Sequence, residues 1–223
     1  MSVTDVSHRH HRTPPCQALP SPTLDDVVRW EPGAKERLQA AALELFSTHG
    51  YEQTTAAEIA QAVGLTERTF FRHFSDKREV LFQGQQQYVQ KFLDGIASAP
   101  DGAAPLDMIA AALASAATFF PDERRPHSRQ RQSVIDKNPA LHEREMQKRA
   151  GLVATLADAL RARGVTEPAA TLAAESGGAV FGLAFLQWLS DGETRPMDEI
   201  SADMLRQFQG LSRPVRHQPP NRH

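Results

Sequence analysis

The sequence contains a single cysteine, Cys16, among its 223 residues. One cysteine cannot form an internal disulfide bond, which is typical of proteins kept in a reducing compartment. The chain also lacks an uninterrupted run of about 18 apolar residues, so we expect no membrane-spanning helix. Its first residues lack the apolar stretch of a signal peptide. Together these absences predict a cytoplasmic protein.

A strong charge of either sign is missing too. The 25 lysines and arginines are balanced by 27 aspartates and glutamates, which leaves a formal net charge of −2. Any contact with nucleic acid must therefore rely on a local cluster of basic side chains. A serine nucleophile elbow, a phosphate-binding loop and a dinucleotide fingerprint are also absent. We expect neither an enzyme nor a bound cofactor.

Three histidines, His8, His10 and His11, gather near the start of the chain. They could suggest a metal site, but residues 1–33 combine many prolines with an aperiodic apolar pattern, which is typical of a disordered arm. Such an arm fixes no ligand geometry, so no metal site is expected. Prolines likewise predict a flexible tail over residues 213–223.

Helical periodicity begins at Ala34, and no convincing strand pattern follows it. Apolar residues four, seven and eight positions after Leu38 predict a first helix that ends at Gly50. Thr55 with Glu58 three residues later forms a capping box at the start of a second helix, which Gly64 ends.

A short third helix, Glu67 to His73, follows with Thr66 as its cap. Ser75 and Asp76 are expected to cap a longer fourth helix, and the break that follows it at residues 100–105 is the expected hinge between domains. The apolar stripe of the fourth helix includes Leu81, Tyr88, Phe92 and Ile96.

Five more helices are expected after this break, which gives an all-α protein of about nine helices. We divide the chain into a first helical domain at 34–82 and a second at 83–212. The five helices lie near 106–120, 123–137, 140–163, 167–190 and 197–211.

Residues 54–74 form a helix-turn-helix, in which a tight glycine turn joins two short helices and the second can enter the DNA major groove. Arg68 can donate to guanine, Glu67 can accept from cytosine, and Thr69 can contact thymine. Residues 66–78 hold four basic against two acidic side chains, whereas residues 34–65 hold two against four. The positive charge therefore gathers where phosphates would lie, and Lys77 is expected near a phosphate at the start of the fourth helix.

The stretch from Leu38 to Leu81 closely resembles the DNA-binding domain of the TetR family of bacterial repressors. The matching residues are Ala41-Ala42-Leu43-Glu44-Leu45-Phe46, His49-Gly50-Tyr51, Thr54-Thr55, Glu58-Ile59-Ala60, Val63-Gly64-Leu65-Thr66, Phe70-Phe71-Arg72-His73-Phe74 and Lys77. The resemblance implies a homodimer, a ligand-binding C-terminal domain and, usually, repression. The segment from Pro139 to Glu145 is loosely similar to mycofactocin-type regulators.

Carried over by position, the resemblance implies a phosphate contact for Thr55 and base contacts for the start of the third helix. The position of Phe71 is commonly tyrosine in the family, and phenylalanine cannot donate to a phosphate. The expected DNA-binding residues are Thr55, Thr66, Glu67, Arg68, Thr69, Phe71, Arg72, His73 and Lys77.

Residues 177–189 are apolar on nearly every side, so a helix here must be buried all round. A partner subunit is the natural cover, in an intersubunit four-helix bundle with the helix at 197–211; a core helix of a single chain is the alternative. Glycines in this segment allow close helix approach. The expected dimer residues are Gly178, Phe181, Phe185, Leu189, Met204 and Phe208.

An effector pocket is expected among the helices that span residues 106–189. Few charged residues fall on their apolar faces, which favours a hydrophobic or aromatic ligand. The basic run of Arg124, Arg125, Arg129 and Arg131 is interpreted as a solvated face rather than an acid-binding site. The expected pocket walls are Phe119, Phe120, Ile135, Met146, Phe181, Phe185 and Trp188.

The sequence thus predicts a regulator that binds double-stranded operator DNA at the nucleoid as a homodimer and is released by a small-molecule effector. Two alternatives stay open: a transcriptional activator of the same fold, and a helical adaptor whose helix-turn-helix packs against protein.

Overall fold

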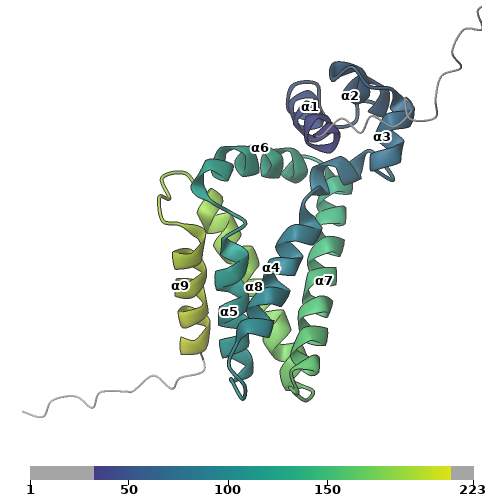
Figure 1. Ribbon diagram of the computed structural model, residues 1–223. Coiled ribbons are helices and arrows are strands. Elements are labelled where there is room, and N and C mark those ends of the chain that lie inside the picture. Colours follow the sequence, from purple (N-terminus) through teal and green to yellow (C-terminus); the bar gives the residue numbers. More distant parts are fainter. Residues whose placement is uncertain (1–32, 212–223) are drawn as a thin grey trace, which may run out of the picture. The chain divides into compact units, whose positions relative to one another are not determined.

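The computed structural model describes residues 33–211 (Figure 1). The expected arm, its histidines, Cys16 and the expected tail from residue 213 lie outside this range. Within it, nine α-helices and two short 3₁₀ helices form and no strand does, which confirms the all-α fold. The α-helices are α1 Ala34–Thr48, α2 Ala56–Ala62, α3 Glu67–His73, α4 Gln85–Ser98, α5 Pro105–Ala117, α6 Arg125–Asp136, α7 Pro139–Ala162, α8 Ala169–Leu189 and α9 Met197–Gly210; the 3₁₀ helices are η2 Arg78–Phe82 and η3 Asp122–Arg124.

The first three helices share a core in which Phe70, on the inner side of α3, is fully buried. Leu38 of α1 and Ile59 of α2 pack around it, as the apolar spacing predicts. Gly64 has a φ of +73°, which glycine adopts without strain, and it turns the chain sharply between α2 and α3. The two short helices are therefore held at a fixed angle by the phenylalanine behind them.

The prediction of a fourth helix that starts at Ser75 and Asp76 is wrong over the first half of that helix. Asp76 accepts hydrogen bonds from the backbone of Arg78 and Glu79, but what it caps is the 3₁₀ helix η2. Gly84 then adopts a φ of +86°, and α4 starts only after it. A left-handed residue cannot continue a helix, so the apolar period runs across a break in the backbone.

The later helices pack mainly along one another, and α6 crosses beside α1 (Figure 1). Residues 100–104, the expected hinge, are instead the turn between α4 and α5, which pack closely together. The apolar helix α8 lies among α5, α7 and α9. Its two adjacent glycines allow close approach, because a Cβ at Gly177 would lie 3.0 Å from Ile109 of α5 and one at Gly178 would lie 2.5 Å from Val153 of α7.

The same helix departs from the expectation about membrane spans. Within the described residues, α8 is long and apolar enough to cross a membrane by length and composition, although 44% of its most apolar window is buried inside the protein. A core helix enclosed by neighbouring helices passes the same test, so the composition of α8 by itself does not indicate a membrane.

The crossing of α4 and α5 depends on Gly95. A Cβ at this position would lie 2.5 Å from the Ala111 carbonyl oxygen and 2.5 Å from the Ala112 Cα, so the two backbones would have to separate. We expect Gly95→Ala to lower the free energy of unfolding by about 1–3 kcal/mol in urea titrations followed by circular dichroism. Gly151→Ala is the matched control, since Gly151 lies in α7 with nothing within 4 Å of its added Cβ. It should be neutral or stabilising by up to about 1 kcal/mol, and equal effects at both glycines would contradict the prediction.

Candidate functional site

The N-terminal end of α3 projects into solvent. The Thr66 hydroxyl accepts a hydrogen bond from the Thr69 backbone N–H at 3.2 Å, which caps the helix as expected. Glu67 and Arg68 in the first turn are exposed, and Thr69 is half-buried. The three residues expected to contact bases therefore begin a helix whose opposite side is fixed by buried phenylalanines.

The next residues along α3 are likewise divided between those exposed to solvent and those that pack toward the core. Phe71 is 50% exposed, and its ring meets the buried Phe70 edge-on at 5.4 Å. Arg72 is exposed and His73 half-buried. Burial lowers the pKa of His73, and the positive charge of Arg72 lowers it further, so this imidazole is neutral at pH 7. A neutral histidine can still donate one hydrogen bond to a phosphate.

Thr55 forms both bonds of the expected capping box with Glu58. Its hydroxyl accepts from the Glu58 N–H at 3.1 Å, and its own N–H donates to the Glu58 carboxylate at 2.7 Å. The hydrogen bonds that the Thr55 N–H and hydroxyl donate to the Glu58 carboxylate lower the pKa of Glu58. The Thr55 hydroxyl also lies 2.9 Å from the carboxylate as a donor, so it would have to rotate to reach a phosphate.

Lys77 lies in a different environment from the one expected. It precedes a 3₁₀ helix, and its ammonium donates to the Tyr51 carbonyl at 2.7 Å and the Thr54 carbonyl at 2.8 Å. It also lies 4.0 Å above the Tyr51 ring, whose burial raises the pKa of the phenol to about 12. Two of the three N–H donors of Lys77 thus hold the α1–α2 loop against the segment that follows α3 in the chain.

This contact predicts a loss of stability in Lys77→Met. Two carbonyl oxygens would lose a charged donor, and we expect the free energy of unfolding to fall by about 2 kcal/mol in urea titrations. Lys91→Met provides the control, because Lys91 is exposed on α4 and should change stability by under about 0.5 kcal/mol. If both variants unfolded at the same urea concentration, Lys77 would have no structural role.

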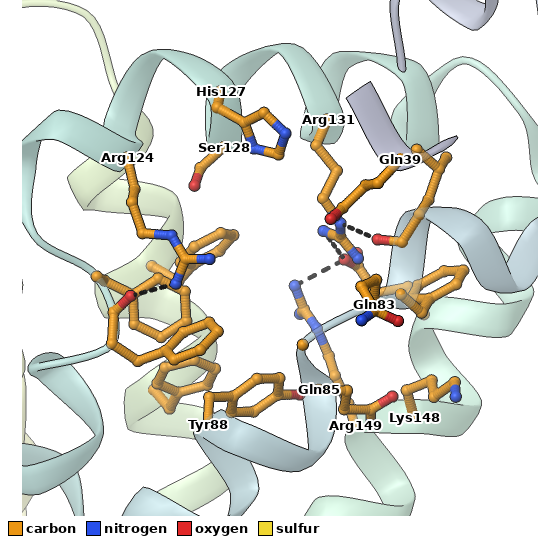
Figure 2. A pocket seen from close by; sticks show the side chains of 18 residues that line it. Gln39, Gln83, Gln85, Tyr88, Arg124, His127, Ser128, Arg131, Lys148 and Arg149 are labelled. Atoms are coloured by element: carbon orange, nitrogen blue, oxygen red, sulfur yellow. Dashed lines mark hydrogen bonds and ion pairs between the residues drawn. The ribbon is translucent and has the colours of Figure 1, made fainter. Parts of the chain in front are cut away.

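A cavity that is partly open to solvent lies among the helices that follow α3 (Figure 2). Four of the seven expected wall residues line it: Phe119, Phe120, Phe181 and Phe185. Gln39 of α1 also reaches its wall, so the cavity borders the helix-turn-helix region. Most of the aromatic side chains gather along one side of it, whereas the ring of Phe82 lies 5.0 Å from the Arg131 guanidinium on the other side.

The other three expected wall residues lie elsewhere. Ile135 is fully buried in the core shared with α1 and η2, and Trp188 is fully buried against Met197 and Ile200 of α9. Met146 is 49% exposed on α7. None of the three lines the cavity.

The polar half of the cavity was missed by the sequence reasoning. Its roof comes from one face of α6 and the turn before it, with His127 and Arg131 pointing inward (Figure 2). Lys148 and Arg149 of α7 and Tyr88 of α4 complete it. A signal was available in the helical spacing of the roof residues: Arg124, His127, Ser128 and Arg131.

The basic run of α6 is not the solvated face we expected. Arg125 is buried and donates to backbone carbonyls of Glu193 and Arg195, in the α8–α9 loop. Arg129 donates to the carbonyls of Leu189 and Ser190 at 2.8 and 2.6 Å. The α6 arginines therefore hold the α8–α9 loop on one side, while Arg131 faces the cavity on the other.

The residues expected at a dimer interface do not share one outer surface. Gly178 faces α7, and Phe181 and Phe185 line the cavity; Leu189, Met204 and Phe208 are half-buried. The side of α8 that lies in solvent carries different apolar residues, which are spaced to form one stripe. They are Leu172 (63% exposed), Ala179, Leu183 (59%) and Leu186 (47%).

Two family models match the chain in sequence. The model of bacterial regulatory proteins of the tetR family matches residues 38–83, and the model of the MftR C-terminal domain matches residues 103–211. The two matches leave only short segments of the described chain uncovered.

Curated relatives and solved structures agree with these models. The chain is 41% identical to the HTH-type transcriptional regulator TcmR of Streptomyces glaucescens over 35% of each protein. It is 34% identical to the putative mycofactocin biosynthesis transcriptional regulator MftR of Mycobacterium tuberculosis, over 49% of this chain and 55% of that one. The matches thus span about a third to a half of these relatives. SmeT, the repressor of a Stenotrophomonas maltophilia multidrug efflux pump, is 19% identical in its triclosan complex, with a TM-score of 0.56 over 79% of this chain and 90% of that one, which shows the shared fold.

Proposed function

Because the chain belongs to the TetR family of bacterial regulatory proteins, we propose that it is a repressor that a small hydrophobic or aromatic effector releases from a palindromic operator. It acts as a homodimer on nucleoid DNA in the cytoplasm. The exposed first turn of α3 is the observation that carries the proposal. Glu67 and Arg68 stand in solvent on a helix that Phe70 anchors from behind, as major-groove readout requires.

The contacts with DNA divide by their chemistry. Arg68, Glu67 and Thr69 read base edges, because they lie in the first turn of the recognition helix. Thr66, Arg72 and His73 lie around this turn and contact the backbone, and the ring of Phe71 packs against a sugar. Thr55 contributes a hydroxyl after rotating away from Glu58. Lys77 positions the loop between α1 and α2 and has one donor left for a phosphate.

Dimer formation uses the apolar stripe of α8. Three leucines on one helix face, each about half exposed or more, form a surface that a second copy would cover. A two-fold axis through this surface pairs each leucine with its counterparts and places two recognition helices on one duplex. Successive major grooves on one face of DNA lie about 34–36 Å apart, so the operator has two half-sites at that spacing.

The cavity among α4 to α8 is the effector site. Its aromatic side suits an apolar or aromatic molecule, and α6 connects it to the DNA-binding region through Ile135 and Val134, which pack in the core of α1 to α3. A ligand that fits one arrangement of α6 better than another changes operator affinity by that difference in binding free energy.

Selection of bound sequences from random DNA tests the proposal. We expect the purified protein to enrich an inverted repeat and to shift it in gel electrophoresis, with an affinity that falls steeply as salt increases. Enrichment of no sequence would overturn the proposal. Transcription from the selected operator in a purified system then distinguishes repression from activation, since an increase would overturn the repressor role.

Arg68→Ala tests the recognition helix within this operator. Loss of a bidentate base contact should weaken binding to the selected operator by about 1–3 kcal/mol and relax one base preference in each half-site. Arg206→Ala serves as the control, because Arg206 is exposed on α9 and bonds only to Asp203 of its own helix. Unchanged affinity and base preference in Arg68→Ala would assign base readout to other residues.

A further inference from the structure

We propose that the cavity binds an amphipathic anion, an apolar body with a single carboxylate, and that Arg149 and Arg131 hold this carboxylate. The inference rests on the proposed effector role of the cavity and adds the chemical class of the ligand. The sequence reasoning favoured a hydrophobic or aromatic ligand over a multiply charged one, and it did not place the basic side chains of α6 and α7 on the cavity wall.

The apolar side of the cavity is continuous. Phe181 lies parallel to Tyr88 with ring centres 6.0 Å apart, and it meets Phe120 at 5.8 Å. Phe119 lies 5.8 Å from Tyr88 and closes this side. A ligand body placed here would contact ring faces and edges and no charged group except Arg124, whose guanidinium lies 4.1 Å over Phe119.

The opposite side carries more positive than negative charge. Arg131 and Arg149 share one carboxylate, Glu145, at 3.3 and 3.5 Å. Each arginine brings a full positive charge, so this trio retains one charge that its own carboxylate does not balance.

The neighbouring groups add to the same excess. Lys148 and Arg144 share Glu79, at 2.9 and 2.6 Å, which again leaves one positive charge. Among the ion pairs of the described residues, none includes Arg124, which donates to the Phe119 carbonyl at 2.8 Å. Glu145 is the only carboxylate among the described residues that line the cavity, and cations from two helices outnumber it.

Partial burial strengthens the attraction of this excess positive charge for a carboxylate. The side chains of Arg131 and Arg149 are 20% and 34% exposed, and Glu145 is 9% exposed, so water screens them incompletely. Desolvation lowers the pKa of His127 in the roof, and the positive charges of Arg124 and Arg131 lower it further. A carboxylate would balance the excess with charge-assisted hydrogen bonds, whereas an ammonium would add to the repulsion.

Three probes with one apolar body and different head groups test the proposal. They are 2-naphthylacetate, 2-naphthaleneethanol and 2-naphthylethylammonium, titrated into the full chain at pH 7.5 by isothermal calorimetry. We expect the anion to bind about tenfold more tightly than the alcohol, the cation to bind most weakly, and added sodium chloride to weaken only the anion. A preference for the alcohol or the cation would overturn the proposal, and so would the absence of binding by all three probes.

Three variants at two positions locate the ends of the ligand. Arg149→Gln should remove the preference for the anion and leave the alcohol unchanged, and Arg149→Lys should restore part of it because the charge returns. Phe181→Ala should weaken the anion and the alcohol alike. An Arg149→Gln variant that kept the full preference for the anion would overturn the assignment of the head group. A chain that selects an operator but shows no preference for the anion contradicts this inference alone, whereas a chain that prefers the anion but selects no operator contradicts only the proposed function.

Discussion

Replacing Leu183 with glutamate is expected to convert the protein from a dimer into a monomer and to abolish tight operator binding. Leu183 is 59% exposed at the centre of the apolar stripe of α8, between Ala179 and Leu186. In an isologous interface one substitution changes both copies. Two leucine contacts would be lost and two carboxylates would face each other, so we expect dimerisation to weaken by about 4 kcal/mol or more, roughly a thousandfold.

Two measurements separate association from folding. Sedimentation should show a dimer for the unaltered chain and a monomer for Leu183→Glu at micromolar concentration, while circular dichroism shows equal helix content. Met146→Glu is the matched control, because Met146 is a similarly exposed apolar residue on α7 that lies outside the stripe. If Leu183→Glu sedimented as a dimer and bound the selected operator normally, the dimer would use another face.

Local signals in the sequence were sufficient to predict the helix-turn-helix. The bounds of α3 match the expected helix, because Thr66 caps it and Gly64 turns the chain before it. Both residues act on their immediate neighbours, so no tertiary information is needed. The break at Gly84 was missed because the apolar period continues on both sides of it, and periodicity alone does not report the backbone angles of a glycine between them.

Only some of the predicted wall residues line the cavity, because the apolar face of a helix can continue beyond the end of a pocket. Ile135 lies one turn after Arg131 on the same side of α6, but there the neighbours are α1 and η2. Trp188 continues the stripe of Phe181 and Phe185 along α8, where α9 covers it. Periodicity places such residues on the correct face and gives no information about where along the helix the neighbours change.

The same limit explains why the residues expected at the dimer interface do not share one outer surface. The sequence shows α8 to be apolar on nearly every side, but not which side packs against α5 and α7 of the same chain. In the structure Gly178 faces Val153 and the phenylalanines face the cavity. The side of α8 that lies in solvent carries leucines such as Leu172 and Leu183. Sequence reasoning could not distinguish these leucines from the apolar residues of α8 that pack inside the chain.

Arg131→Met is expected to cause the largest loss of stability among single substitutions at the cavity. The Arg131 guanidinium donates to the Leu81 carbonyl at 2.7 Å and to Glu145 at 3.3 Å, so it joins α6 to η2 and to α7. Removing it leaves a buried carboxylate with only Arg149 as an ion-pair partner. We expect the free energy of unfolding to fall by about 3 kcal/mol in urea titrations, because the Leu81 carbonyl loses a charged donor and the buried Glu145 carboxylate loses one of its two arginine partners.

A double-mutant cycle separates the charge from the packing. In Arg131→Met with Glu145→Gln the buried carboxylate is absent, so about half of the lost stability or more should return, whereas additive losses would show that the ion pair contributes little. Arg206→Met is the control for removing a guanidinium from an exposed pair and should change stability by under about 0.5 kcal/mol.

The double variant also tests the link between the cavity and DNA binding. Arg131 is the cavity residue that bonds directly to the backbone of η2, the segment that follows α3. With this bond removed, the folded double variant should bind the selected operator. 2-Naphthylacetate, at concentrations that calorimetry shows to saturate each protein, should release the double variant less completely than it releases the unaltered chain. Equal release by the probe would show that the connection between cavity and recognition helix runs through the packed core of α1 and α6 without Arg131.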